Sequence, residues 1–209
     1  MTAVVVAGLL AGYGIAIPVG AVGAYLVAVT ARAGWRTGAG AALGVATADG
    51  VYALLAVAGG SALVPLLAPV MDPLRWVSAV VLVGLAVRAA YVALSAYRTG
   101  GLASRDDGTA LTPGRAYLTF LGITILNPMT VIYFAALILA TGPSAPATLP
   151  DRTAFVLAAL VASASWQFLL ALGGTLLGRT LTGVRGRLVT ALASSTLIVV
   201  LAVRLVARG

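Results

Sequence analysis

Long stretches without a single charged residue run through this chain and constrain its fold more than any other feature. They cover residues 1–31, 50–71, 116–150, 153–178 and 188–203. About 20 apolar residues in a helix cross the hydrocarbon core of a bilayer, and each stretch approaches or exceeds that length. Only helices and closed barrels satisfy their backbone hydrogen bonds inside a bilayer. Because so many uncharged runs are of helical length, the sequence predicts an all-α integral membrane protein.

The composition agrees with this prediction and excludes several function classes. Hydrophobic residues make up 61% of the 209 residues and charged residues 9%, whereas soluble domains contain about 25% charged residues. The chain has no cysteine and no histidine, which removes disulfides, thiolate metal sites and the commonest general base. The net charge of +8 comes from arginines that lie between the apolar runs. We interpret these arginines as orientation signals rather than as a nucleic-acid surface, and we expect no cofactor.

Six transmembrane helices are predicted, at about 4–30, 38–62, 75–97, 116–140, 153–178 and 188–207. They form one transporter domain with halves at about 1–98 and 115–209, joined by a solvated loop at 99–114. The first run is about twice as long as the core of a signal peptide, so we expect a retained span. Three helices per half imply that the halves are inverted relative to each other.

The arginines predict the orientation in the membrane. The connections after the first, third and fifth helices hold Arg32, Arg36, Arg98, Arg105, Arg115, Arg179, Arg185 and Arg187. The opposite side holds Arg75, Arg152, Arg204 and Arg208. Arginine is enriched in cytoplasmic loops. We therefore expect these three connections to be cytoplasmic and both termini to lie outside.

Polar and helix-breaking residues gather at one predicted depth in five of the six spans. In chain order they are Pro18, Asp49, Arg88, Asn127 with Pro128, and Ser165 with Gln167. Proline removes a helical hydrogen bond, and irregular backbone persists in a membrane only where protein or a water-filled cavity satisfies it. A broken helix also exposes an N-terminus that suits a carboxylate. We interpret this layer as a substrate site; the alternative is that the prolines only shape helix packing.

Asp49 is the only acidic residue inside a predicted span. Inserting a carboxylate there costs at least ~2.5–3.5 kcal/mol, which indicates a use for it. Loss of hydration disfavours the charged form, so Asp49 is predicted to couple to a proton or to the substrate. Arg88 lies at a similar predicted depth, and we expect the two to pair in one transport state. Alternatively, Arg88 faces a separate aqueous cavity or binds a substrate carboxylate directly.

Several further residues complete the predicted site. Thr47 lies in a segment, Ala46–Asp49, that resembles Ala162–Ser165 in the second half. Trp166 is mid-span and either fills the core or lines the pathway. Gly40 and Gly44 match a small-residue packing motif. The predicted substrate-binding residues are Pro18, Gly20, Thr47, Asn127, Pro128, Ser165, Trp166 and Gln167.

Four segments carry a resemblance to a known family. They are Gly12-Tyr-Gly-Ile-Ala-Ile-Pro-Val-Gly20, Arg32-Ala-Gly-Trp-Arg36, Asp49-Gly-Val-Tyr52 and Leu121-Gly-Ile-Thr-Ile-Leu-Asn-Pro128. Their order resembles the lysine-exporter (LysE/RhtB) family of bacterial amino-acid exporters over essentially the whole chain. One departure concerns the first span, where the usual Pro-Gly-Pro of the family is replaced by Pro18-Val-Gly20-Ala21.

The resemblance implies export of amino acids or similar small metabolites, driven by the proton motive force, across the bacterial inner membrane. The expected partners are the substrate, the proton and the bilayer, and a homo-oligomer stays open. Three alternatives remain. A metal or ion transporter needs several hard oxygen or imidazole ligands. An intramembrane enzyme needs a nucleophile beside an activating base. The third is a membrane assembly protein that does not transport.

Overall fold

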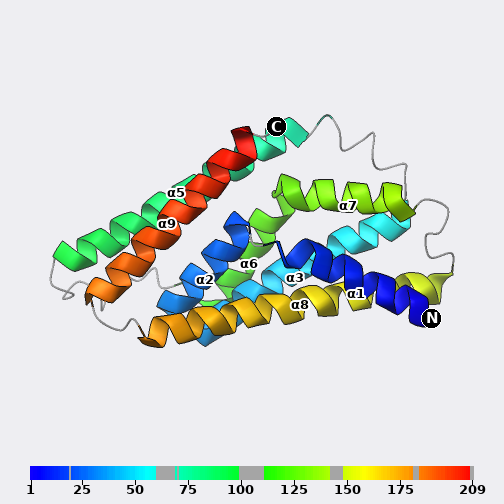
Figure 1. Ribbon diagram of the computed structural model, residues 1–209, viewed down its shortest axis with the longest axis horizontal. Coiled ribbons are helices and arrows are strands. Elements are labelled where there is room, and N and C mark those ends of the chain that lie inside the picture. The colour runs from blue at the N-terminus through cyan, green and yellow to red at the C-terminus, as the bar shows by residue number, and fades with distance from the viewer. Residues whose placement is uncertain are drawn as a thin grey trace.

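The protein is built from α-helices (Figure 1). The computed structural model describes residues 1–18, 20–59, 69, 71–98, 111–141, 148–180 and 184–207. With the labels of Figure 1, the helices are α1 (Thr2–Ala16), α2 (Ala21–Ala33), α3 (Trp35–Gly59), α5 (Met71–Arg98), α6 (Pro113–Ile125), α7 (Pro128–Thr141), α8 (Leu149–Thr180) and α9 (Val184–Ala207). The predicted all-α class is confirmed for these residues.

Two of the predicted spans are broken at their prolines. The axes of α1 and α2 differ by 76° across residues 17–20, next to Pro18. The axes of α6 and α7 differ by 60° across residues 126–127, and Pro128 is the first residue of α7. Proline suits a first helical position because no hydrogen bond is required of its nitrogen there. The predicted helices at 4–30 and 116–140 are therefore each two helices joined at an angle.

Several helices are long and apolar enough to cross a bilayer. Among the described residues these are Trp35–Gly59, Asp72–Ser95 and Leu149–Gly178, and each bent pair meets the same criterion when its two helices are taken together. The structure thus holds three to five candidate spans. α9 contains a shorter apolar stretch, Ala191–Arg204. A multi-pass membrane protein is confirmed, whereas α9 as a sixth span stays a prediction.

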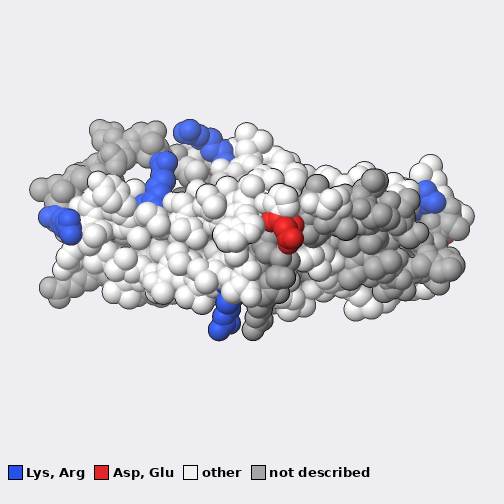
Figure 2. Space-filling view, turned by 90° about the horizontal axis from the view of Figure 1, so that it is seen from above, with Lys and Arg blue, Asp and Glu red and all other residues white. Residues whose placement is uncertain are grey.

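The surface of the bundle has the character expected next to lipid. Large apolar side chains point outward, as Leu10, Val80 and Leu118 do with exposed fractions of 67%, 68% and 65%. Figure 2 shows few and widely spaced charged side chains on the face that it presents. An apolar surface of this extent favours a membrane over water.

Helix α3 is the centre of the bundle. It packs most extensively against α6 and α8, and also against α2 and α7. Ala41, Ala42, Ala48 and Ala53 of this helix are fully buried, and their small side chains let its neighbours approach. α5 and α9 form a pair that packs mainly on itself, to one side of the other helices (Figure 1).

Glycines four residues apart bring three pairs of helices into backbone contact. The glycines and the residues whose carbonyl oxygens they face are Gly40 and Gly44 of α3 with Pro113 and Tyr117 of α6, Gly8 and Gly12 of α1 with Phe155 and Ala159 of α8, and Gly174 and Gly178 of α8 with Val27 and Ala31 of α2. A Cβ atom at any of the six glycines would overlap a backbone oxygen. The predicted packing role of Gly40 and Gly44 is confirmed.

The start of the second half differs slightly from the prediction. α6 begins at Pro113, where a helix start at about 116 was expected. Thr112 caps this helix because its hydroxyl accepts a hydrogen bond from the backbone N–H of Arg115 at 3.3 Å, which satisfies one of the free N–H groups of the first turn. Residues 99–110 of the predicted loop at 99–114 lie outside the described residues.

Candidate functional site

A cavity of about 590 Å³ lies where the two helix breaks meet. Pro18 and Gly20 from the first break and Asn127 from the second line it, together with residues of α1, α2, α3, α5, α6, α7, α8 and α9. Pockets for small molecules have volumes of about 300–1,000 Å³. The two breaks therefore enclose a space that a small metabolite can fill.

Asp49 of α3 supplies the carboxyl group of this cavity. The residue is 4% exposed, and its Oδ2 accepts a hydrogen bond of 2.6 Å from the hydroxyl of Ser163 on α8. Ser163 is itself fully buried. The hydrogen bond joins two closely packed helices and so fixes the carboxyl group at the cavity wall.

Two further polar side chains of the cavity wall have an atom without a partner. These atoms are Oε1 of Gln167 on α8 and Oγ1 of Thr124 on α6, and neither has a hydrogen-bond partner within the part of the chain that the structure describes. The two residues are 5% and 2% exposed. Buried polar groups are nearly always hydrogen-bonded. Both atoms are therefore suited to contact a bound ligand.

Two helix N-termini also lie at the cavity. The first residues of α2, from Ala21 to Gly23, line it, and its N-cap residue Gly20 has no side chain with which to cap the helix. At the start of α7, Oδ1 of Asn127 accepts a hydrogen bond of 3.2 Å from the backbone N–H of Met129. The free N–H groups of a first helical turn carry a partial positive charge. Because α7 is capped and α2 is not, α2 is the better site for an anionic group.

Hydroxyl groups from neighbouring helices hold the backbone at the break between α6 and α7, and another hydroxyl joins α7 to α1. Tyr52 of α3 donates a hydrogen bond of 2.6 Å to the carbonyl oxygen of Ile125, and Ser78 of α5 donates to that of Leu126. Tyr133 of α7 donates a hydrogen bond of 2.9 Å to the carbonyl oxygen of Ala11. Irregular backbone in a membrane needs such partners. The break between α6 and α7 is thus a supported part of the fold.

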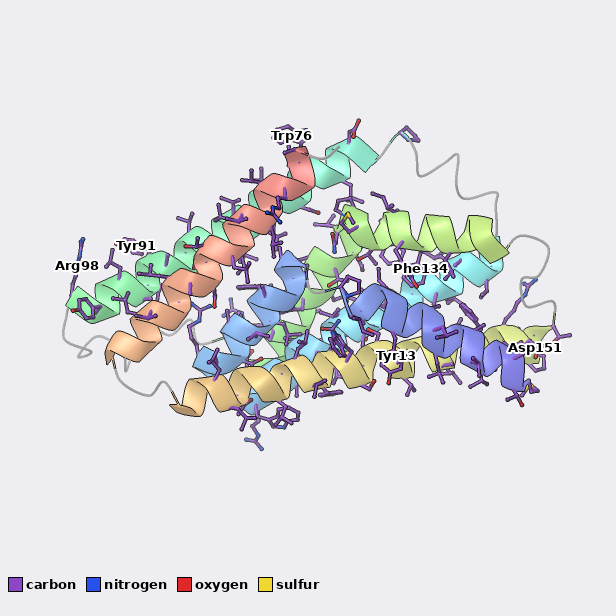
Figure 3. All side chains as sticks on the ribbon, in the orientation of Figure 1. Tyr13, Trp76, Tyr91, Arg98, Phe134 and Asp151 are labelled. Carbon is purple, nitrogen blue, oxygen red and sulfur yellow. The ribbon has the colours of Figure 1, made fainter. Side chains whose placement is uncertain are left out.

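Replacing Tyr52 by phenylalanine is expected to destabilise the break between α6 and α7. The change keeps the ring that stacks on Phe134 and leaves the carbonyl of Ile125 without its donor. Losing one partner of such a hydrogen bond costs about 1–3 kcal/mol, so the unfolding midpoint in detergent should fall by a few degrees. Tyr91→Phe is the control, because this side chain is 73% exposed and lies on the outer side of α5 (Figure 3). Equal midpoints for the two variants would contradict the role of Tyr52.

Comparison with known proteins agrees with this architecture. Residues 14–209 match the family described as LysE type translocator, and this range contains both helix breaks and all residues that line the cavity. The chain belongs to the LysE type translocator family. Searches of curated proteins and of solved structures found no match. The resemblance drawn from the sequence motifs is confirmed, and it assigns a small-molecule transporter of the membrane.

The cavity of this translocator contains half of the predicted substrate-binding residues. Pro18, Gly20, Asn127 and Gln167 line it, as does Asp49. Their common position follows from the breaks, which bring distant parts of the chain to one place.

The other predicted binding residues lie outside the cavity wall. The hydroxyl of Thr47 donates to the carbonyl of Leu43 in its own helix. Ser165 bonds to the hydroxyl of Tyr13, at 2.9 Å, and to the carbonyl of Ala162. Pro128 is buried at the start of α7, and Nε1 of Trp166 is buried without a partner among the described residues. These residues were selected by depth along their helices, and depth does not fix the direction in which a side chain points.

The predicted contact between Asp49 and Arg88 is not formed in this conformation of the translocator. Both residues are described; Asp49 bonds to Ser163, while Arg88 is exposed and does not line the cavity. The pairing was expected for one transport state, and for any other state it stays a prediction. In this state Arg88 is not a cavity residue.

Sequence analysis missed four polar residues of the cavity wall: Thr124, Thr130, Tyr133 and Arg204. Thr130 and Tyr133 lie three and six residues after Asn127, a spacing that keeps helical residues on one side and could have identified them. Arg204 was assigned to orientation because it ends the last apolar stretch. The contact between α2 and α9 brings it to the cavity, and no local sequence signal reports that contact.

Proposed function

We propose that this LysE type translocator is a secondary exporter of amino acids or similar small metabolites, driven by the proton motive force. The supporting observation is the cavity between the two helix breaks, which combines the carboxyl group of Asp49 with polar atoms of Gln167 and Thr124 that have no partner among the described residues. Intramembrane carboxylates of transporters typically serve substrate and proton pathways. The substrate, on this proposal, binds in the cavity with its ammonium group at Asp49.

We place the cavity near the middle of the membrane, between two inverted halves of three spans each. α9 has 24 residues and is therefore about 36 Å long, enough to complete six spans. The packing supports the two halves. In this arrangement α1 and α2 correspond to α6 and α7, α3 corresponds to α8, and α5 corresponds to α9. The contact between α3 and α6 then has its equivalent in the contact between α8 and α1. The contacts of α3 with α8 and of α5 with α9 each join equivalent helices, and all four contacts are extensive.

Asp49 provides a means of coupling export to protons. In its ionised form it attracts a substrate ammonium group, and in its protonated form it does not, so proton and substrate compete for one carboxyl group. When the cavity opens outward, the higher proton concentration outside favours protonation and substrate release. When it opens inward, Asp49 loses the proton to the cytoplasm and binds the next substrate. Substrate export is thereby coupled to proton import.

The location follows from the same proposal. Proton-driven export places the protein in the inner membrane of a bacterial cell. The arginine distribution places the connections after the first, third and fifth spans in the cytoplasm and both termini outside. With this orientation both states of the cavity are reached by alternate opening of the two broken helices, whose bends of 76° and 60° offer the points of movement.

The proposal predicts a measurable export activity. Cells that carry the gene, loaded with a panel of labelled amino acids, should release some of them faster than cells without it, and a protonophore should abolish the difference. Cells that carry the Tyr91→Phe variant, which leaves the cavity intact, should release the same amino acids as cells with the unmodified protein. Export that persists with the protonophore would contradict the proton coupling and leave the export function standing. Equal release of the whole panel with and without the gene would contradict amino-acid export.

A further inference from the structure

We infer that the cavity selects zwitterionic amino acids with an apolar side chain, and that Arg204 together with the start of α2 binds their carboxylate. The inference rests on the proposed export function and specifies its substrate. It follows from three properties of the cavity wall, which are its hydrogen-bond acceptors, its cationic region and its apolar residues.

The acceptors of the cavity wall come from three helices. They are the carboxyl group of Asp49 on α3, Oε1 of Gln167 on α8 and Oγ1 of Thr124 on α6. All three residues are at least nine-tenths buried, and the latter two atoms have no partner among the described residues. An ammonium group has three donors and no acceptor. A protonated α-amino group can therefore donate to acceptors of this kind.

The cationic region of the wall has two parts. Arg204 of α9 supplies the guanidinium group among the described residues of the wall, and the uncapped N-terminus of α2 supplies free N–H groups at residues 21–23. α2 and α9 pack against each other, and both features line the same cavity. Guanidinium binds a carboxylate through two parallel hydrogen bonds, and a helix N-terminus adds partial positive charge.

The rest of the wall is mostly apolar. Val22, Val45, Leu82, Leu170 and Leu201 contribute to it from five different helices. One carboxyl and one guanidinium group complement a ligand with one charge of each sign. A dibasic amino acid brings a second ammonium group for which the described wall holds no second carboxylate, and desolvating an unpaired charge is costly. The wall therefore favours side chains such as that of leucine over that of lysine.

The unmodified protein tests this selectivity directly. Equilibrium binding to the purified protein in detergent should be measured for leucine, isoamylamine, isocaproate and lysine. Isoamylamine is leucine without its carboxylate, and isocaproate is leucine without its ammonium group. Leucine should bind at least about tenfold more tightly than each of the other three. Equal affinity for leucine and isoamylamine would overturn the proposed binding of the carboxylate. Tighter binding of lysine than of leucine would overturn the preference for apolar side chains.

Variants of Arg204 test which group binds the substrate carboxylate. Arg204→Gln should weaken leucine binding about tenfold or more and leave isoamylamine binding unchanged, whereas Arg204→Lys should retain part of the leucine affinity. Arg98→Gln is the control, since Arg98 ends α5 and points away from the other helices (Figure 3). Unchanged leucine affinity in Arg204→Gln would overturn the role of Arg204 in binding the carboxylate. If the Arg204 variants do not accumulate, the ligand series on the unmodified protein decides. Export of only dibasic or acidic amino acids in the cell assay would overturn this selectivity and leave the export function standing.

Discussion

Asp49→Asn is expected to reduce export to the level of cells without the gene, while the protein still accumulates in the membrane. Asparagine keeps the size of the side chain and can still accept the hydrogen bond from Ser163. It removes the charge that binds the ammonium group and the site that binds the proton. Breaking a buried charge pair costs about 2–5 kcal/mol, or about 30-fold or more in affinity. The measurements are efflux of the exported amino acid and membrane abundance.

Two matched variants make this result specific. Ser163→Ala keeps the carboxyl group and removes only its hydrogen bond, so export should fall by a smaller factor. Asp72→Asn makes the same chemical change in the first turn of α5, where the residue is exposed and outside the cavity, and export should be near normal. Wild-type efflux by Asp49→Asn would contradict the proposed role of the carboxyl group in both binding and coupling.

Membrane abundance of single and double variants tests whether Asp49 and Arg88 pair at another stage of the transport cycle. A lone buried charge is worse than none, so removing one partner of a pair harms the protein more than removing both. Arg88→Gln should then lower abundance, and the double variant with Asp49→Asn should be better than additive. Additive effects would mean that Arg88 acts independently of Asp49, in agreement with its exposed position here.

Gly174→Leu is expected to prevent the translocator from accumulating. A Cβ atom at this position would lie 2.7 Å from the carbonyl oxygen of Val27 and 3.0 Å from the Cβ atom of Thr30. Backbone atoms of α2 cannot turn away as the end of a side chain can, so α2 and α8 would have to separate. Overpacking of this kind costs about 1–3 kcal/mol or more, and here it displaces the helix whose start lines the cavity. Membrane abundance and the unfolding midpoint are the measurements.

The neighbouring glycine provides the control for this variant. Gly173 belongs to the same turn of α8, and a Cβ atom there meets nothing within 4 Å. Gly173→Leu should be neutral or slightly stabilising, because leucine is a better helix former than glycine by roughly 0.5–1 kcal/mol. An equal loss of membrane abundance in both variants would show that glycine is needed in α8 for some reason other than contact with α2.

The helix breaks were predictable because their cause is local. Pro18 and Pro128 each remove a backbone donor, and this effect on a helix does not depend on distant residues. The position of Asp49 at the site was predictable for a related reason, since a carboxylate inside an apolar span needs a polar environment that only an interior cavity supplies. The structure has bends beside the two prolines, and Asp49 lies in the cavity wall, while its role at a substrate site stays a prediction.

The direction of the remaining side chains was not predictable. α3 carries small and apolar residues on every side, so its sequence has no apolar stripe to mark an inner face. Thr47 and Asp49 therefore look equally suited to a site, although two residues correspond to a rotation of about 200° around the helix. Arg88 and Arg204 show the same difficulty. The central position of Arg88 in its span suggested a cavity, yet Arg204 near the end of α9 is the arginine that lines it.

The pairing of α5 with α9 has a consequence for biosynthesis. α3 packs on α6 as well as on α8, whereas α5 packs chiefly on α9, the last helix of the described chain. A membrane chain is made from its N-terminus onward, so α5 is in the bilayer without α9 while α6, α7 and α8 are inserted. Assembly intermediates that bind an insertase or a membrane chaperone are therefore expected to present the uncovered face of α5.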